Sequence, residues 1–535
     1  LFFRRVVLSP PSPPPSIVRI VVVLLPSSSS SSILVFFGSK VMMCRLLTIR
    51  FCSCVCVCVC VCQSRQSRRG LVIIAFRSCF CCNDFSLLSM NEFFFIKNFC
   101  VKLKMKLPLS PRFGALPITT TATKAKDEGE TTRTTRTTKR VMSSSSGCAS
   151  LVTSRVARDA RDALHPVATG VCHVCLVNDA LNASGVTINE NCDPAVRRDV
   201  MRAFSELEFD ATVMKRSVSV PILSGAMAFG TWQGLYLCNF KNDNNDNKDD
   251  DVLIRTTVRE SDFKKTKRGE FVAPRRGCHD ATTTIATTVD ITDVKMGVLN
   301  VMIKHTSASL TINDGRKAEE LESGLNTLIP ESWNDTFLEH TMEGPDDCPA
   351  HIKATILGET MNVPIRDGKL VLSSENEHIL LCEHRNVGGY GGGFRREFIA
   401  TVNEAKAQEV VKLTVDKNRK LVNVSEAVRA FVTKADDATI EVVHVFSPKG
   451  GVFMSTADEA EAFLEHLDKK VSSNAVLKSS VIGASEMLVV EDGDGRKMFA
   501  EGLECFVVTN GDDDGEEEEE EEEEDGVGLV VFTAL

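Results

Sequence analysis

The sequence predicts an α+β fold of three tandem domains, each built from mixed or antiparallel β-sheets with flanking helices. Two repeated patterns lead to this prediction. An apolar run, a short polar interruption and a second apolar run, typical of two strands joined by a turn, occur at 170–191, 297–314 and 441–456. A glycine-centred turn and an alternating apolar strand follow at 220–242, 363–386 and 489–511. Internal self-similarity of this kind indicates a repeated structural unit.

Helices are predicted between the two patterns, because apolar residues there recur three and four positions apart. These stretches are 193–207, 315–329 and 456–471. A further helix opens the outer copies at 153–164 and 424–435, with Thr153 or Ser154, and Ser425, as N-caps. Each unit therefore runs helix, two strands, helix and several strands, and the expected domain bounds are 142–262, 263–406 and 407–535.

Residues 1–141 are expected to be a disordered leader, a targeting segment or mistranslated sequence. Of the 20 cysteines, 11 lie in the first hundred residues, mostly in the tract CSCVCVCVCVC. Strict Cys-Val alternation does not suit a disulfide framework and is what a translated dinucleotide repeat would give, with a zinc-binding tract as the alternative. Residues 105–140 have the Thr, Lys and Arg of a transit peptide, but their acidic residues favour a plain leader.

The overall composition is that of a soluble globular protein, with 43% hydrophobic and 25% charged residues. The acidic run at 512–525 holds 13 negative charges, more than the net charge of -10 for the whole chain. The rest of the chain is therefore close to neutral. A near-neutral body argues against nucleic-acid and membrane partners. The run itself is predicted to be a solvated loop of the third domain. Scattered cysteines in the three domains suit a reducing compartment, so we expect a cytoplasmic protein, with organelle targeting as the alternative.

Residues 337–358, FLEHTMEGPDDCPAHIKATILG, carry the strongest chemical signal. They hold two histidines and the carboxylates of Glu343, Asp346 and Asp347 within a short span broken by two prolines. A lone histidine is more often a packing residue than a ligand. Here five of the ten histidines fall between 305 and 384, which favours a metal site.

Three segments of the middle copy resemble the YjbQ-type family, often labelled secondary thiamine-phosphate synthase enzyme. They are IKHTSASLTIND, HTMEGPDDCPAHIKATILGETMNVPIRDGKL and LLCEHRN, and the first copy adds TINENCDPAVRRD and GTWQGLYLC. The resemblance is close across 276–402, gapped across 148–259 and only architectural across 407–535. It implies homotrimers with a metal held by shared histidines. Three fused copies are then expected to dock as an intramolecular pseudo-trimer, so that the chain is a monomer.

The resemblance places one complete site in the middle copy. His305, His340 and His351 are the expected metal ligands, for a divalent ion that is zinc in the first instance, although three imidazoles also suit Fe, Ni or Cu. The first copy lacks the equivalent histidine and the EGPDD–AHIK segment, but keeps Trp232 and Gln233, which we expect to complete the site across the docking interface. The outer copies are otherwise expected to be scaffold.

Four further residues are candidates for catalysis. Glu343 and Asp347 could accept a ring proton of a ligand histidine or act as general base, while a capped helix start is the alternative for Asp346 and Asp347. Glu383 and Arg385 end a strand on one face, where Arg385 could clamp a phosphate or form a surface ion pair. Cys348 and Cys382 are expected to be core residues rather than nucleophiles, because no base accompanies them.

The resemblance implies an enzyme that joins a pyrimidine pyrophosphate to a thiazole phosphate and releases pyrophosphate. Its partner would be a small phosphorylated substrate. A metal-dependent hydrolase with the same site is the alternative within this class. A non-catalytic metal-binding or interaction protein is the alternative outside it, with the metal enclosed by four ligands.

Overall fold

The computed structural model divides into two compact units, residues 1–114 and residues 115–535. The residues that the structure describes are 20–25, 32–37, 40–51, 55–62, 73–78, 135–143, 148–163, 169–177, 184–240, 251–386, 394–415, 421–435, 440–471, 474–490, 498–499, 502–508 and 526–535. The acidic run at 512–525, predicted to be a solvated loop, lies outside them.

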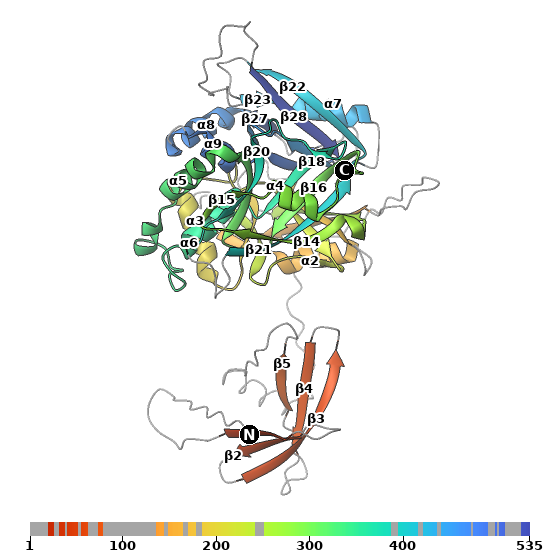
Figure 1. Ribbon diagram of the computed structural model, residues 1–535, viewed down its shortest axis with the longest axis vertical. Coiled ribbons are helices and arrows are strands. Elements are labelled where there is room, and N and C mark those ends of the chain that lie inside the picture. The colour runs from red at the N-terminus through yellow and green to blue at the C-terminus, as the bar shows by residue number, and fades with distance from the viewer. Residues whose placement is uncertain are drawn as a thin grey trace, which may run out of the picture. The chain divides into compact units, whose positions relative to one another are not determined.

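The first unit contains one antiparallel sheet in the order β1-β2-β3-β4-β5 (Figure 1). Its strands are β1 (Ile20–Leu25), β2 (Ser32–Phe37), β3 (Lys40–Phe51), β4 (Val55–Cys62) and β5 (Ile73–Ser78). They lie in the segment expected to be a disordered leader, a targeting segment or mistranslated sequence. The Cys-Val tract forms β4, and its alternate β-branched valines explain why it takes an extended conformation.

The second unit contains three pairs of sheets, and the first pair includes every element from 135 to 261. Its large sheet has the order β11-β10-β8-β13-β6 and its small sheet the order β7-β12-β9. The elements are β6 (Thr135–Ser143), β7 (Cys148–Leu151), α2 (Thr153–Ala163), β8 (Thr169–Leu176), β9 (Ser184–Glu190), α3 (Pro194–Leu207), β10 (Ser217–Leu223), β11 (Ala226–Met227), β12 (Gln233–Asn239) and β13 (Asp251–Ser261). Strand β6 begins before Met142, so this sheet takes in residues that were expected in the leader.

The second and third pairs of sheets follow the same plan. Their large sheets run β14-β21-β16-β18-β19 and β22-β28-β24-β26, and their small sheets run β15-β20-β17 and β23-β27-β25. The second set is η1 (Phe263–Lys265), β14 (Thr266–Ala273), β15 (Gly277–Asp280), α4 (Thr282–Thr288), β16 (Met296–Ile303), β17 (Ala308–Asp314), η2 (Gly315–Lys317), α5 (Ala318–Leu328), η3 (Glu331–Asp335), α6 (Asp347–Leu357), β18 (Thr360–Arg366), β19 (Lys369–Leu370), β20 (Glu377–Glu383) and β21 (Phe394–Glu404). The third set is β22 (Ala407–Val415), β23 (Leu421–Asn423), α7 (Ser425–Ala435), β24 (Val442–Phe446), β25 (Gly451–Thr456), α8 (Ala457–Lys470), α9 (Ala475–Ile482), β26 (Ser485–Val489), β27 (Leu503–Val508) and β28 (Gly526–Ala534).

The predicted α+β fold class is therefore confirmed, with antiparallel sheets throughout. We call β6–β13 the first repeat, β14–β21 the second repeat and β22–β28 the third repeat. The predicted helices correspond to α2, α3, α5, α7 and α8 to within a few residues at each end. Helices α4 and α9 were not predicted. Helix α9 is buried from Val476 to Ile482, polar residues included, so it lacks the amphipathic pattern.

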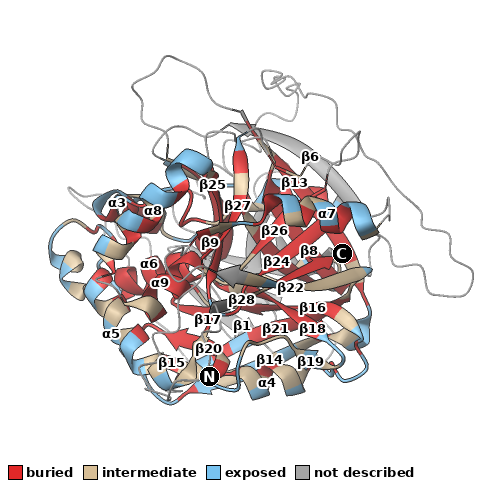
Figure 2. Cartoon of the chain, turned by 90° about the horizontal axis from the view of Figure 1, so that it is seen from above, coloured by how far each residue is buried: buried red, intermediate tan, exposed pale blue. Residues whose placement is uncertain are grey.

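Helices from all three repeats share one apolar core. Phe204 of α3, Leu325 of α5, Ile352 of α6, Leu464 of α8 and Leu477 of α9 belong to the same buried cluster. Helices α6 and α9 lie at its centre, where almost every residue is buried (Figure 2). A core assembled from several repeats joins them into one body, as the expected pseudo-trimer requires.

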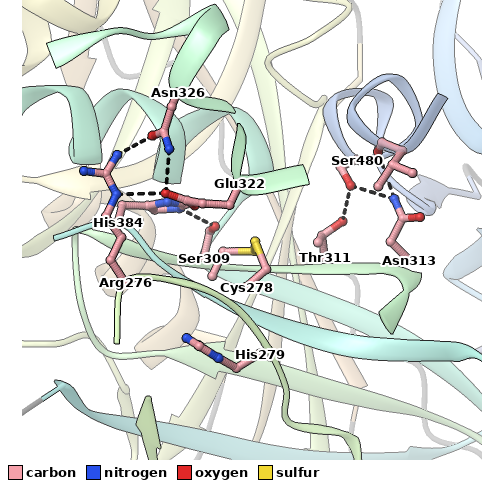
Figure 3. Close-up of a disulfide and its surroundings, with 12 residues drawn as sticks. Arg276, Cys278, His279, Ser309, Thr311, Asn313, Glu322, Asn326, His384 and Ser480 are labelled. Atoms are coloured by element: carbon pink, nitrogen blue, oxygen red, sulfur yellow. Dashed lines mark hydrogen bonds and ion pairs between the residues drawn. A yellow bond between two sulfur atoms is a disulfide. The ribbon is translucent and has the colours of Figure 1, made fainter. Parts of the chain in front are cut away.

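A disulfide between Cys278 and Cys382 joins β15 to β20 (Figure 3). The two cysteines are direct partners in the antiparallel pairing, with Cα atoms 4.0 Å apart. Cys382 is fully buried as expected, but it is not a free thiol. Its partner lies 104 residues away in the sequence, so only the strand pairing brings the two together.

Within the described part of the chain, none of the helices has both the length and the apolar composition needed to cross a bilayer.

Candidate metal centre

Helix α6 carries two of the site residues on one buried face. Asp347 begins the helix and His351 follows one turn later, so both side chains point the same way. All eleven residues of α6 are buried, because the helix lies between the small sheet of its own repeat and the helices of the neighbouring repeats. A rigid, buried helix therefore fixes this pair.

Three potential ligand atoms from two repeats lie within 4.8 Å of one another. They belong to His340 and His351 of the second repeat and to Glu190 of the first repeat. Glu190 Oε2 is 3.2 Å from His351 Nε2. Asp347 Oδ2 approaches the same point, 2.7 Å from His340 Nε2 and 3.4 Å from His351 Nε2. Two imidazoles and two carboxylates converge there, which is a donor set typical of zinc and similar ions.

One ring nitrogen of His351 has a hydrogen-bond partner and the other has none among the described residues. Its Nδ1 lies 2.9 Å from the carbonyl oxygen of Thr306 and must donate to it, which leaves the lone pair on Nε2. That Nε2 is buried and has no hydrogen-bond partner among the described residues, since the nearby carboxylates lack hydrogen-bond geometry. A ligand histidine that donates its second N–H to a carbonyl is the usual arrangement in metal sites. The ring therefore fits a metal ion at Nε2.

The imidazole of His340 lies between two carboxylates. Its Nδ1 is 2.7 Å from Asp193 Oδ2 and its Nε2 is 2.7 Å from Asp347 Oδ2. Asp193 belongs to the first repeat, where its other oxygen caps α3 by accepting from the backbone N–H of Ala195. The hydrogen bond from the Ala195 N–H is the largest cause that lowers the pKa of Asp193, and the hydrogen bond with His340 is the second. The carboxylate stays ionised and can hold the Nδ1 proton, so that Nε2 is presented to the site.

Glu190 was not among the predicted ligands. Burial raises the pKa of its carboxyl, but the nearby rings of His351 and His340 outweigh burial, so the pKa is lowered overall. An ionised carboxylate is the form that a metal needs. The sequence did hold one signal, because an acidic residue follows the letters TIN in both the first and the second repeat.

His305, predicted to be the third histidine ligand, lies outside the His340–His351–Glu190 group. Its Nδ1 accepts a hydrogen bond from the backbone N–H of Ser307 at 3.0 Å, because the turn after the ring folds back on it. Burial, with the charge of Arg396, lowers the pKa of His305 to about 3, so the ring is neutral. Glu190 takes the third place in the group instead.

Gln233 reaches across the interface from the first repeat, although not to the metal group. Its Nε2 donates to the carbonyl oxygens of Ile303 (2.9 Å) and His305 (3.0 Å). Gln233 thus holds the backbone of the His305 turn. The neighbouring Trp232 accepts from Asn191 through its backbone carbonyl, while its side chain is 56% exposed.

Arg385 and Glu383 are held by ion pairs. Arg385 binds Asp346 and Asp347 through its guanidinium and donates to the carbonyl of Glu343 at 2.8 Å. The expected phosphate clamp is therefore already engaged by two carboxylates, and it orients Asp347. Glu383 is fully buried, and burial raises its pKa despite an ion pair with Arg396 at 2.6 Å. The Glu343 side chain is exposed.

Comparison with known proteins gives a consistent family. The family model described as UPF0047 protein YjbQ-like matches residues 269–405. The UPF0047 protein YjbQ of Escherichia coli O157:H7 is 35% identical over 134 residues, which are 24% of this chain and 91% of that protein. The UPF0047 protein MJ1081 of Methanocaldococcus jannaschii is 32% identical over 154 residues, 28% of this chain and 97% of that protein.

Solved structures also match, at lower identity. A YbjQ-like protein of unknown function from Sulfolobus solfataricus P2 is 20% identical and matches with a TM-score of 0.23, covering 26% of this chain and 96% of its own. The hypothetical protein APE1520 from Aeropyrum pernix K1 is 21% identical, with a TM-score of 0.23, and covers 26% of this chain and 98% of its own. Nearly the whole length of the Escherichia coli and Methanocaldococcus jannaschii relatives thus corresponds to about a quarter of this chain.

Proposed function

This chain belongs to the UPF0047 YjbQ-like family, and we propose that it is a metal-dependent enzyme with one active site between its first and second repeats. The observation that carries the proposal is the buried Nε2 of His351, which lacks a hydrogen-bond partner among the described residues and faces two carboxylates. A buried nitrogen left without a partner is costly, and a bound cation removes that cost.

His340, His351 and Glu190 would hold the metal, which we propose to be zinc. Asp347 is either a fourth ligand or an acceptor beside the metal. Two imidazoles and one carboxylate are a common first shell of catalytic zinc, and they leave a coordination position for substrate. When bound, the ion supplies Lewis acidity toward a carbonyl or phosphoryl oxygen.

The residues around the site prepare it for proton transfer. Arg385 pairs with Oδ1 of Asp347, which leaves Oδ2 directed toward both imidazoles. Asp347 can therefore accept a proton from a substrate or from water at that oxygen, as a general base does. On the other side of His340, Asp193 holds the ring orientation.

We propose hydrolysis as the first reaction class to test, with transfer of the thiamine-phosphate synthase type as the second. In both classes the substrate is a small phosphorylated compound. In transfer with pyrophosphate release, a free guanidinium would stabilise the negative charge that develops on the departing phosphates. Arg385, the candidate for that role, is engaged by Asp346 and Asp347, which favours hydrolysis. A non-catalytic metal-binding protein is the remaining alternative, and it would use Asp347 to close the coordination shell.

Elemental analysis of the purified full chain after exposure to zinc tests the metal. We expect about one zinc per chain, because binding needs the full ligand set. His340→Ala and His351→Ala should lose it, whereas His305→Ala, just outside the group, should keep it. Zinc-free wild-type protein, or about three ions per chain, would overturn the proposal of a single metal site.

An activity assay then separates the reaction classes. The full chain is incubated with phosphate monoesters and pyrophosphate esters, or with a pyrimidine pyrophosphate plus a thiazole phosphate. Hydrolysis releases phosphate without an acceptor, and transfer requires both substrates. Asp347→Asn should lower the rate by about 100-fold while it retains zinc, if Asp347 is the base. Stoichiometric zinc without turnover of any substrate would favour the non-catalytic alternative.

A further inference from the structure

His340 lies on a segment without regular secondary structure of its own. Within the described range 251–386, residues 336–346 form neither helix nor strand and connect η3 to α6. The backbone N–H groups of Glu339 and His340 both donate to one oxygen, Asp199 Oδ2, at 2.8 Å each. Asp199 belongs to α3 of the first repeat. The backbone that carries a ligand of one repeat is thus held by a side chain of another.

Asp199 is fully buried, and three of its hydrogen bonds are directed at residues 339–348. Its Oδ2 accepts a third hydrogen bond from the Cys348 thiol at 3.4 Å, and its Oδ1 is 3.3 Å from the Arg202 guanidinium. A buried carboxylate costs several kcal/mol unless such bonds surround it. Its position inside α3, a turn beyond the first residues, excludes a capping role. Its hydrogen bonds to the backbone of residues 339–340 therefore explain why a carboxyl side chain is buried at this position.

The same helix also reaches the ring of His340. Asp193, the N-cap of α3, binds Nδ1 of the imidazole at 2.7 Å. Helix α3 therefore fixes His340 at two points, the main chain through Asp199 and the ring through Asp193. Without either contact, the loop would have to hold the ligand by itself.

We infer that Asp199 is a positioning residue of the metal centre, through which the first repeat sets the geometry of a ligand in the second repeat. This inference rests on the proposed metal-dependent function. Removing the carboxylate leaves two main-chain N–H groups without their acceptor and frees the ligand segment. Loss of a partner that orients a metal ligand typically weakens metal binding 10–100-fold.

Titration of the metal-free full chain with Co²⁺, followed by its visible absorption, tests the inference. Asp199→Ala should bind Co²⁺ about 10–100-fold more weakly and with a changed spectrum, because the ligand geometry is altered. Asp199→Asn keeps an oxygen acceptor and should restore most of the affinity and the wild-type spectrum. Val200→Ala is the matched control, because Val200 is a buried neighbour on the same helix. It should lower the unfolding temperature and leave Co²⁺ binding unchanged.

The possible outcomes separate the two proposals. Wild-type affinity and spectrum in Asp199→Ala would overturn the positioning role and leave the metal site standing. Equal weakening by Val200→Ala would overturn it too, since general destabilisation would then explain the loss. If the wild-type chain binds no Co²⁺, the proposed function itself fails. Should Asp199→Ala not fold, Asp199→Glu shifts the oxygens by one methylene and should bind more weakly than Asp199→Asn; equal affinity would contradict the inference.

Discussion

The interface between the first and second repeats and the interface between the second and third repeats share one clasp. In the first, Asn189 Nδ2 donates to the carbonyl oxygen of His351 at 3.1 Å and to the Thr355 hydroxyl. In the second, Asn313 Nδ2 donates to the carbonyl oxygen of Val476 and to the Ser480 hydroxyl, both at 2.9 Å (Figure 3). One asparagine therefore docks a strand end of one repeat on a buried helix of the next, in the same way twice.

The chemistry around the clasp differs between the two interfaces. The position of His351 is taken by Val476, so the second interface offers no imidazole there. The side chains that contact the acidic residue after each asparagine also differ. Glu190 faces two imidazoles, whereas Asp314 is bound by the Arg316 guanidinium at 2.7 Å. The asparagine contacts are thus kept at an interface that lacks the proposed metal-binding residues, so docking and the proposed metal site depend on different residues.

Replacing His351 with valine would make the first interface like the second, and it carries the largest expected effect. The clasp should survive, because Asn189 binds the backbone carbonyl of residue 351 and not its ring. Zinc affinity should fall by more than about 100-fold, because the ligand itself is removed. Isothermal calorimetry with zinc measures the loss, and circular dichroism checks the fold. Val476→Ala serves as the matched control. Zinc binding that survives in His351→Val would break the comparison.

Removing the clasp itself tests whether docking and metal chemistry are separable. Asn189→Ala and Asn313→Ala each remove one donor from a carbonyl and one from a hydroxyl, which costs about 1–3 kcal/mol of the free energy of unfolding. The carbonyls keep one side-chain donor each, the Thr355 and Ser479 hydroxyls. Urea denaturation should report a similar loss for both. Zinc affinity should fall only in Asn189→Ala, since Asn189 holds the helix turn that carries His351. An equal fall in both variants would mean that the interfaces act as one unit.

Much of this architecture could be predicted from the sequence. The apolar periodicity gave the repeated helices, and the dense run of histidines and acids marked His340, Asp347 and His351. Glu190 could not be found in that way, because it lies in the preceding repeat and only docking brings it to the site. His305 lies outside the group of ligand atoms, and its turn uses one ring nitrogen to accept the Ser307 N–H, a local contact that the sequence does not reveal. Similarly, the sequence does not reveal that the Arg385 guanidinium forms ion pairs with Asp346 and Asp347.

The ion pair between Arg316 and Asp314 offers a smaller test of the comparison. Its two side chains are 61% and 22% exposed, so Arg316→Ala should change the free energy of unfolding by less than about 1 kcal/mol. Arg316→Ala should not create a second zinc site, because Val476 supplies no ligand. Adding Val476→His to it gives the acid an imidazole neighbour. Calorimetry should then detect weak zinc binding at the second interface, and a double variant without it would show that an imidazole and a free acid are not sufficient.

The smallest expected difference is a pH effect on the metal-free protein. Burial opposes ionisation of Glu190, but His351 and His340 lower its pKa overall, while the Arg316 side chain lowers that of Asp314. Both carboxylates have folded-state pKa values below their ordinary values, so each adds stability that is present above those values and is lost as the pH falls through the lowered pKa. Urea unfolding between pH 7 and pH 3 should show a shallower acid loss in Glu190→Gln and in Asp314→Asn than in the wild type. An acid loss as steep as that of the wild type in either variant would contradict a lowered carboxyl pKa at that position.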